Sequence, residues 1–272
     1  MNNFFQWIEG TPISFPAPGW ELNPPLGFTL GAFNIRFYGV IIAIGMVLAV
    51  VYALKRKQQF GLTEDDLLDG VLWIVPFAVI CARAYYCIFS WDDYRSDPIS
   101  VLYIWNGGLA IYGGVIGAII GMFVLSKVKK INVWALFDLV SLGFLIGQGI
   151  GRWGNFMNRE AYGSVTTLPW RMGLVEHGVT VYVHPTFLYE SLWNLAGFGL
   201  LHFLSKKRKY NGQIALGYVA WYGLGRTVIE GLRTDSLMLG NLRVSQLLAA
   251  VSCLTAVVIL IVNALRCKED KV

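Results

Sequence analysis

A group of polar and charged side chains follows directly on an apolar run that is long enough to cross a bilayer. The run is 131–150, and the next segment, 151–163, reads GRWGNFMNREAYG. A charge at the centre of a membrane helix costs about 2.5–3.5 kcal/mol on insertion scales, so such residues usually mark function. Arg152 and Asn155 share one helical face, with Arg159 one turn further on. This grouping suits an anion such as a phospholipid phosphate; the alternative is an asparagine-capped helix end with a snorkelling arginine.

The elements that position this group are those of a polytopic membrane protein. Hydrophobic residues make up 56% of the chain, charged residues only 14%, and the mean hydropathy is +0.54. A net charge of +5 could suggest nucleic acid, but no nucleic-acid motif accompanies it. All ten lysines follow alternate apolar runs, which marks them as cytoplasmic anchors; they lie in the clusters 55–57, 127–130, 206–209 and 268–271.

We expect an all-α bundle of about seven transmembrane helices, with the N-terminus outside and the C-terminus in the cytoplasm. Residues 1–272 then form a single membrane-embedded domain, in which 1–31 is an extracytoplasmic interfacial segment and 158–183 an external loop that could act as a lid. The four cysteines show no CxxC pairing and read as structural thiols, and no metal, cofactor or cleaved signal peptide is expected. The expected spans are 32–54, 68–89, 107–125, 131–150, a fifth opened by His184 and Pro185, 214–232 and 244–265.

Glycines recur every four residues on the third and fourth expected spans. Membrane helices lack a hydrophobic drive to associate, so small-residue ladders allow the close backbone approach that packs them. We therefore predict that these two spans pack tightly and bring Tyr112 near Arg152. The ladders are Gly113, Gly117 and Gly121, and Gly143, Gly147 and Gly151.

Arginine, unlike lysine, is abundant on the predicted outer side. Arg83, Arg152 and Arg226 come from three different spans at similar outer depth, with few acidic residues to match them. On the sixth span Tyr222 and Glu230 lie one turn on either side of Arg226, so a structural pair of Arg226 with Glu230 is one alternative. Unmatched buried positive charge would otherwise be neutralised by a bound anion.

Four segments now carry a resemblance. GRWGNFMNREAYG, GGLAIYGG, HPTFLYESLWN and YGLGRTVIEGLR together resemble the prolipoprotein diacylglyceryl transferases, enzymes of the bacterial inner membrane, over essentially the whole chain. The resemblance implies an active site toward the outer leaflet. It implies transfer of the diacylglyceryl group of phosphatidylglycerol to the lipobox cysteine of a preprolipoprotein, with formation of a thioether and release of glycerol phosphate.

The resemblance also implies roles for individual residues. Arg152 corresponds to the signature arginine that binds the lipid head group, and Arg226 to an essential arginine of the sixth span. Many members have a histidine, proposed as the base, where this chain has Tyr112. The further matching positions are Tyr38, Asn155, Glu160, Gly163, Tyr222 and Glu230.

The acceptor thiol must become a thiolate, because the thiolate is the nucleophile. A free cysteine has a pKa near 8.5. Guanidinium groups would lower the pKa of the acceptor thiol and stabilise the departing phosphate. We therefore expect Arg152 and Arg226 to clamp the phosphate, with Arg83 also binding substrate. Tyr112, with a reference pKa of about 10, either assists deprotonation or only positions the lipid.

His184 and Glu190 are alternative proton acceptors, unless they serve helix-end and interhelical hydrogen bonds. A lipid or anion transporter that uses the same arginines, and a structural seven-helix protein, are the competing functions. Transporters commonly show repeated halves, and no repeat is visible in this chain.

Overall fold

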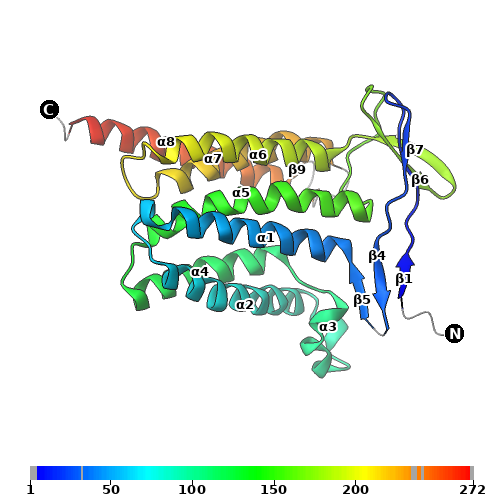
Figure 1. The fold of residues 1–272 in the computed structure, drawn as a ribbon, viewed down its shortest axis with the longest axis horizontal. Helices are drawn as coiled ribbons and strands as arrows, with labels where there is room; N and C mark the ends of the chain where they lie inside the picture. The colour runs from blue at the N-terminus through cyan, green and yellow to red at the C-terminus, as the bar shows by residue number, and fades with distance from the viewer. Residues whose placement is uncertain (1–4, 32, 234–237, 240–241, 270–272) are drawn as a thin grey trace. The chain divides into compact units, whose positions relative to one another are not determined.

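Helices dominate the computed structural model, which describes residues 5–31, 33–233, 238–239 and 242–269. The beginning of the predicted interfacial segment, Ala32 of the first predicted span and Lys271 of the last lysine cluster lie outside the described residues. The long helices are α1 (Phe37–Arg56), α2 (Glu64–Phe89), α4 (Ile111–Lys129), α5 (Val133–Asn158), α6 (Thr186–Ser205), α7 (Gln213–Ile229) and α8 (Val244–Glu269) (Figure 1).

Five helical segments are long and apolar enough to cross a membrane: Phe37–Phe60, Glu64–Phe89, Ile111–Lys129, Val133–Asn158 and Val244–Cys267. The prediction of a polytopic helical membrane protein is thereby confirmed. The other two predicted spans are α6 and α7, which lie outside this set. Helix α7 has only 17 residues, and α6 buries polar side chains that lower its hydropathy, among them Glu190 and Asn194. The count of seven spans stays a prediction.

The expectation of an all-α protein is wrong in the segments outside the helices, which form small antiparallel sheets. One sheet pairs β1 (Phe5–Ile8), β4 (Gly27–Leu30) and β5 (Phe33–Arg36), so α1 begins later than expected. A second has the order β3-β2-β6-β7 and joins the N-terminal segment to the predicted external loop. These strands have only two to five residues each, which is too short for a clear alternating pattern in the sequence. The members of the second sheet are β2 (Ile13–Phe15), β3 (Trp20–Leu22), β6 (Met172–Glu176) and β7 (Val179–Val183), and a third sheet pairs β8 (Met238–Leu239) with β9 (Leu242–Arg243).

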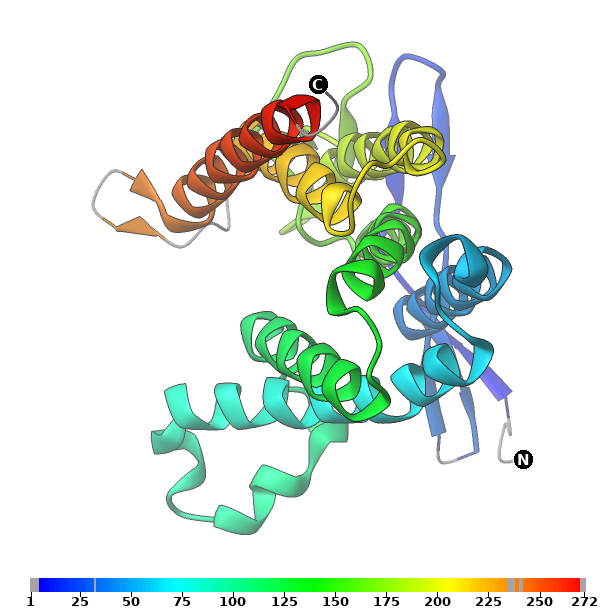
Figure 2. The ribbon, with the colours of Figure 1, turned by 90° about the vertical axis from the view of Figure 1, so that its left-hand side faces the viewer.

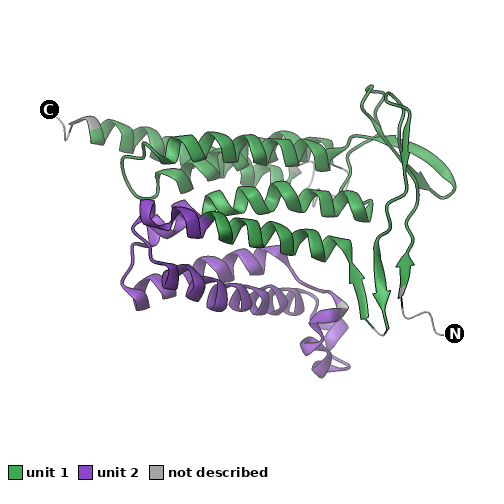
Figure 3. Cartoon of the chain, in the orientation of Figure 1, with its two compact units in different colours: residues 1–52, 141–272 green, residues 53–140 purple. Residues whose placement is uncertain are grey.

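The chain divides into two compact units, coloured separately in Figure 3. Unit 1 comprises residues 1–52 and 141–272, and unit 2 comprises residues 53–140.

In unit 1, α1, α5, α6, α7 and α8 run alongside one another (Figure 1), and Figure 2 shows α1, α5 and α6 nearly end-on and α8 at a slant. Helices α6 and α7 are joined by Trp193 and Trp221, whose rings stack at a centroid distance of 4.4 Å. The indole N–H of each donates to the backbone oxygen of the other, at 3.0 and 2.9 Å. Ser191 of α6 donates to the Gly149 oxygen of α5 at 2.7 Å. These bonds fix the three helices that carry the polar residues described below.

Each glycine ladder packs against a helix within its own unit, and the predicted contact between the two ladders stays a prediction. On α5, a Cβ added at Gly143 or Gly151 would meet Ala49 or Ile42 of α1. On α4, in unit 2, Gly113, Gly117 and Gly121 face α2. The motif correctly indicates close backbone approach, but periodicity along one helix does not say which neighbour approaches it. The α2 residues that face the α4 ladder are Ile74, Ala78, Cys81 and Ala82.

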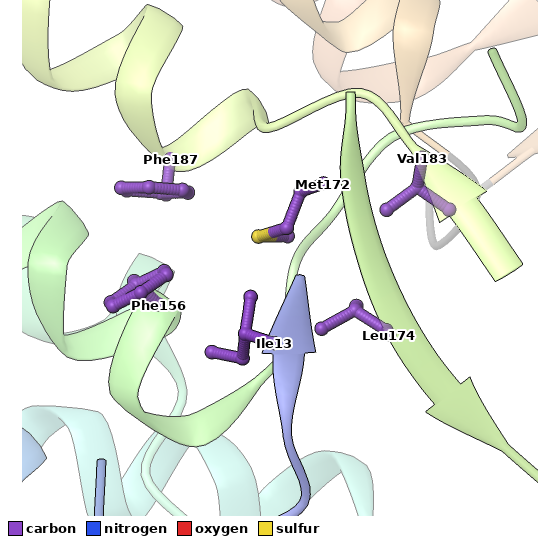
Figure 4. Close-up of a cluster of buried hydrophobic side chains, with 6 residues drawn as sticks. All are labelled: Ile13, Phe156, Met172, Leu174, Val183 and Phe187. Atoms are coloured by element: carbon purple, nitrogen blue, oxygen red, sulfur yellow. The ribbon is translucent and has the colours of Figure 1, made fainter. Parts of the chain in front are cut away.

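An apolar cluster attaches the second sheet to the ends of α5 and α6 (Figure 4). Phe156 of α5 and Phe187 of α6 lie with ring centroids 4.7 Å apart. Burial of such side chains stabilises by about 1.5–3 kcal/mol each. The sheet is therefore fastened to the end of the helices at which the sequence places its polar signature. The cluster consists of Ile13, Phe156, Met172, Leu174, Val183 and Phe187.

Candidate functional site

The Glu190 carboxylate on α6 is shared by three guanidinium groups that come from different parts of unit 1. Its Oε2 lies 2.6 Å from Nη2 of Arg152 on α5. Its Oε1 lies 3.5 Å from Nη1 of Arg226 on α7 and 3.4 Å from Nη1 of Arg233, which follows the helical turn η4 (Glu230–Leu232). We call Arg152, Glu190, Arg226, Glu230 and Arg233 the arginine cluster.

Glu230 is the second carboxylate of the cluster. Its Oε2 lies 2.6 Å from Nη2 of Arg226, so the predicted i, i+4 pair is present. Its backbone oxygen accepts a hydrogen bond from Nη1 of Arg243 at 2.6 Å. The alternative that Arg226 forms a structural pair with Glu230 is therefore correct for Nη2 of Arg226, while Nη1 faces Glu190.

The two carboxylates of the cluster are buried, and its five side chains together hold one more positive than negative charge. The side chain of Glu190 is 6% exposed and that of Glu230 is 2% exposed, so both carboxylates have lost most of their hydration. Breaking such a pair by removing one partner is costly, because the remaining charge is left buried and uncompensated. A cavity of about 10 Å³ adjoins Glu190, Asn194, Tyr222 and Arg226. This volume suits a single water.

The GRWGNFMN segment forms the last two turns of α5 and extends the cluster by a relay of hydrogen bonds. Arg152 Nη1 donates to Asn155 Oδ1 at 3.4 Å, and Asn155 Nδ2 donates to Glu160 Oε1 at 2.9 Å. The predicted common face of Arg152 and Asn155 is confirmed. The ring of Tyr38 lies against Gly154, and its hydroxyl is within the electrostatic reach of Glu160 and Arg152. Four predicted site residues thus come together at the end of α5.

Arg159 does not continue the face of Arg152, contrary to expectation. The backbone leaves the helix at Arg159 with a φ of 54°, and its guanidinium bonds the N-terminal segment instead. Nε donates to the Thr11 oxygen at 3.0 Å, and Nη2 donates to the Pro24 oxygen at 2.6 Å. Burial lowers the pKa of Arg159 from its ordinary value. Arg159 is thus a structural anchor for the sheets.

Gly163 lies where three chain segments cross, and it explains the position of Arg233. The Gly163 N–H donates to the His184 oxygen at 3.0 Å, while Gly163 and Arg233 form a β-bridge. A Cβ at this position would lie 2.7 Å from the His184 Cβ and 3.0 Å from the Leu232 oxygen. Only glycine fits this crossing without displacement of the neighbours.

Arg233 itself was missed as an individual site residue in the sequence. It was one of nine arginines on the predicted outer side, and its spacing of three residues from Glu230 is the helical signal that would have drawn attention to it.

His184 lies outside the cluster's ion pairs. Its Nδ1 is 3.3 Å from the Tyr189 hydroxyl, which accepts a hydrogen bond from Trp170 Nε1 at 2.7 Å. Tyr222 adjoins Arg226 at the small cavity. Of these two candidates, Tyr222 thus lies at the arginine cluster, and His184 lies just before the N-terminal end of α6.

The remaining candidates, Arg83 and Tyr112, belong to unit 2, and their position relative to the cluster stays a prediction. Arg83 is 6% exposed and binds backbone oxygens of the 98–108 segment, including Val101 at 2.8 Å and Gly107 at 2.7 Å. Its guanidinium also lies 5.1 Å from the centroid of the Tyr94 ring. Tyr112 is the second residue of α4 and is 50% exposed.

Fold and site together define a polytopic helical membrane protein with a buried arginine–carboxylate cluster at the sheet-bearing end of its helices. Comparison with known proteins gives the family. The model of the prolipoprotein diacylglyceryl transferase family matches residues 25–262. The chain belongs to this family, which confirms the resemblance.

Curated relatives agree over nearly the full chain. A phosphatidylglycerol–prolipoprotein diacylglyceryl transferase of Limosilactobacillus reuteri is 45% identical over 250 residues, covering 88% of this chain and 90% of the relative. One from Clostridioides difficile is 43% identical over 233 residues, covering 86% and 92%. One from Bacillus velezensis is 41% identical over 271 residues, covering 96% of both chains.

Proposed function

We propose that this chain is the enzyme that transfers the diacylglyceryl group of phosphatidylglycerol to the thiol of the lipobox cysteine of preprolipoproteins. Family membership and full-length curated relatives support the activity. The reaction forms a carbon–sulfur bond to the glycerol carbon and breaks its bond to the phosphate oxygen. Glycerol phosphate leaves with the bonding electrons, and the thiol proton passes to a base.

The observation that carries the proposal is the sharing of Glu190 by three guanidinium groups from separate segments. Three like charges would repel one another without the carboxylate. Glu190 therefore preorganises a set of donors that a phosphate oxygen can take over, because arginine binds phosphate and carboxylate with the same planar fork. As the carbon–oxygen bond breaks, negative charge grows on the phosphate, and donors already in place stabilise it without reorganisation.

The cluster is proposed to face the outer leaflet of a bacterial plasma membrane. The lysine clusters at 55–57, 127–130 and 206–209 lie at or just beyond the C-terminal ends of α1, α4 and α6, and the positive-inside rule assigns these ends to the cytoplasm. The sheets of unit 1 and the ends of α5 and α7 that carry the cluster then lie outside. This topology makes α6 and α7 the fifth and sixth of seven spans, with the N-terminus outside.

The individual roles follow from the contacts. Arg152, Arg226 and Arg233 bind the phosphate, and Glu190 and Glu230 position them. Asn155 and Glu160 hold Arg152, and Tyr38 closes the same end of α5. Both carboxylate oxygens of Glu190 are engaged by guanidinium groups from other segments, so Glu190 is assigned the interhelical role left open by the sequence.

The direct test incubates the purified enzyme with phosphatidylglycerol labelled in its acyl chains and a lipobox peptide. Labelled thioether peptide, and its absence with a peptide whose cysteine is replaced by serine, are the expected results. Label that crosses the bilayer of a vesicle without reaching the peptide would instead support transport. In this assay an unchanged kcat of the Tyr112→Phe variant would exclude the Tyr112 hydroxyl from proton transfer.

A further inference from the structure

A polar pair links α5 and α7 below the arginine cluster. Gln148 Nε2 donates to the Tyr218 hydroxyl at 3.0 Å. The Tyr218 ring stacks on Tyr222 with centroids 5.8 Å apart and an interplanar angle of 18°. Gln148 precedes Arg152 by one helical turn and Tyr218 precedes Arg226 by two, which is about 6 and 12 Å along the helix axes. Gln148 and Tyr218 thus lie on the same helix faces as Arg152 and Arg226, further from the sheet-bearing end of the helices.

This pair retains hydrogen-bonding capacity that unit 1 does not use. Gln148 Oε1 is enclosed and has no partner, and no acceptor for the Tyr218 hydroxyl proton occurs in the described part of the chain. Rotating the Gln148 amide by 180° would make the Tyr218 hydroxyl donate to Oε1 and would leave the spare donor on Gln148 instead. The structure places Nε2 toward Tyr218, so the hydroxyl proton of Tyr218 is the spare donor. Unsatisfied groups in an apolar span are unusual and often serve a ligand.

Helix packing alone does not account for the arrangement. An interhelical hydrogen bond between polar side chains does hold membrane helices together. Such a bond needs one donor and one acceptor, however, and Ser191 to Gly149 provides it between α5 and α6 with no polar atom of Ser191 left over. The spare donor of Tyr218 lies instead on the side of α7 that carries Tyr222 and Arg226.

We propose that Tyr218, positioned by Gln148, donates a hydrogen bond to an ester carbonyl of the lipid substrate. The inference rests on the proposed function, in which the arginine cluster binds the lipid phosphate. In a diacyl phospholipid the glycerol esters follow the phosphate on the way to the acyl chains. A donor one to two turns below the phosphate site therefore meets the ester level, and it selects diacyl over dialkyl glycerophospholipids.

The test compares ester-linked phosphatidylglycerol with its ether-linked analogue of equal chain length, which lacks both carbonyls. Wild-type enzyme is expected to show a KM about 3- to 10-fold higher for the ether lipid, the worth of one hydrogen bond. In Tyr218→Phe the KM for the ester lipid rises by a similar factor and the discrimination disappears. The value of kcat changes little, because the contact is made equally in the bound and transition states. Equal KM values for both lipids in the wild type, or unchanged discrimination in Tyr218→Phe, overturn the proposal.

Tyr52→Phe is the matched control. It removes a hydroxyl that lies 2.8 Å from His202 Nδ1 between α1 and α6, and it should keep the discrimination; its loss there too would contradict a specific role for Tyr218. If Tyr218→Phe does not fold, Gln148→Leu decides, since the unheld tyrosine should discriminate less and unchanged discrimination overturns the proposal. A wild-type enzyme inactive on the ester lipid would defeat the proposed function itself, which separates the two failures.

Discussion

Glu190 Oε2 and Arg152 Nη2 lie 2.6 Å apart, and the other oxygen of the same carboxylate faces Arg226 and Arg233. One buried acid on α6 thus holds basic side chains from α5, α7 and the segment after η4. The arrangement explains how several arginines can lie together inside a membrane protein before any lipid arrives.

Replacing Glu190 by glutamine should destabilise unit 1 and abolish transfer. The change leaves three guanidinium groups with one buried carboxylate, and breaking a buried pair costs about 3–5 kcal/mol of the free energy of unfolding. Thermal unfolding in detergent and the labelled-lipid assay measure the two effects. Glu64→Gln is the control, because Glu64 pairs with Lys57 while 58% exposed and should cost less than about 1 kcal/mol. Equal effects of the two substitutions would contradict the conclusion that Glu190 holds the three guanidinium groups together.

Replacing Arg226 by lysine should lower kcat/KM at least about tenfold, which corresponds to 1.4 kcal/mol. Arg226 reaches Glu190 with one nitrogen and Glu230 with another, and a single ammonium group does not reproduce this fork. Steady-state kinetics with phosphatidylglycerol provide the measurement. Arg95→Lys, at a pair with Asp92 whose side chains are 68% and 85% exposed, should retain wild-type kinetics. Full activity of Arg226→Lys would argue against bidentate binding.

Replacing Gly163 by alanine should destabilise the enzyme by about 1–3 kcal/mol, the usual cost of overpacking. The new Cβ would push against the His184 Cβ at 2.7 Å and displace the bridge to Arg233, so activity should fall as well. In Gly199→Ala the Cβ meets nothing within 4 Å on α6, and helix propensity makes that change neutral or slightly stabilising. Unfolding temperatures and activities of both variants test the contrast; a harmless Gly163→Ala would mean that the crossing can relax.

Replacing Gly117 by alanine should loosen unit 2, whereas Gly114→Ala should be tolerated. A Cβ at position 117 would lie 2.6 Å from the Cys81 Cβ on α2, but at position 114 the nearest atom is at an ordinary 3.6 Å. Both added methyl groups point toward α2 and differ in how closely they approach it, so the unfolding temperatures of the two variants test that approach directly. If both were equally stable, α4 would not depend on close approach to α2.

The amino-acid sequence by itself determined the membrane class, most helix positions and the family. Long apolar runs and lysine clusters are local features, and the GRWGNFMNREAYG and YGLGRTVIEGLR segments carry the identity without reference to their neighbours. The i, i+3 and i, i+4 relations of Arg152 with Asn155 and of Arg226 with Glu230 were also predictable, because a helix places such residues together by its own geometry.

Only the tertiary structure decided which helices meet. It assigned the α4 glycines to α2 and the α5 glycines to α1, and it brought Glu190 and Arg233 to Arg152 and Arg226. It also turned Arg159 away from its expected face, by a left-handed residue at the helix end, toward strands that the sequence did not reveal. Contacts between segments far apart in the chain depend on packing partners and on backbone turns, and neither is encoded in the periodicity of a single helix.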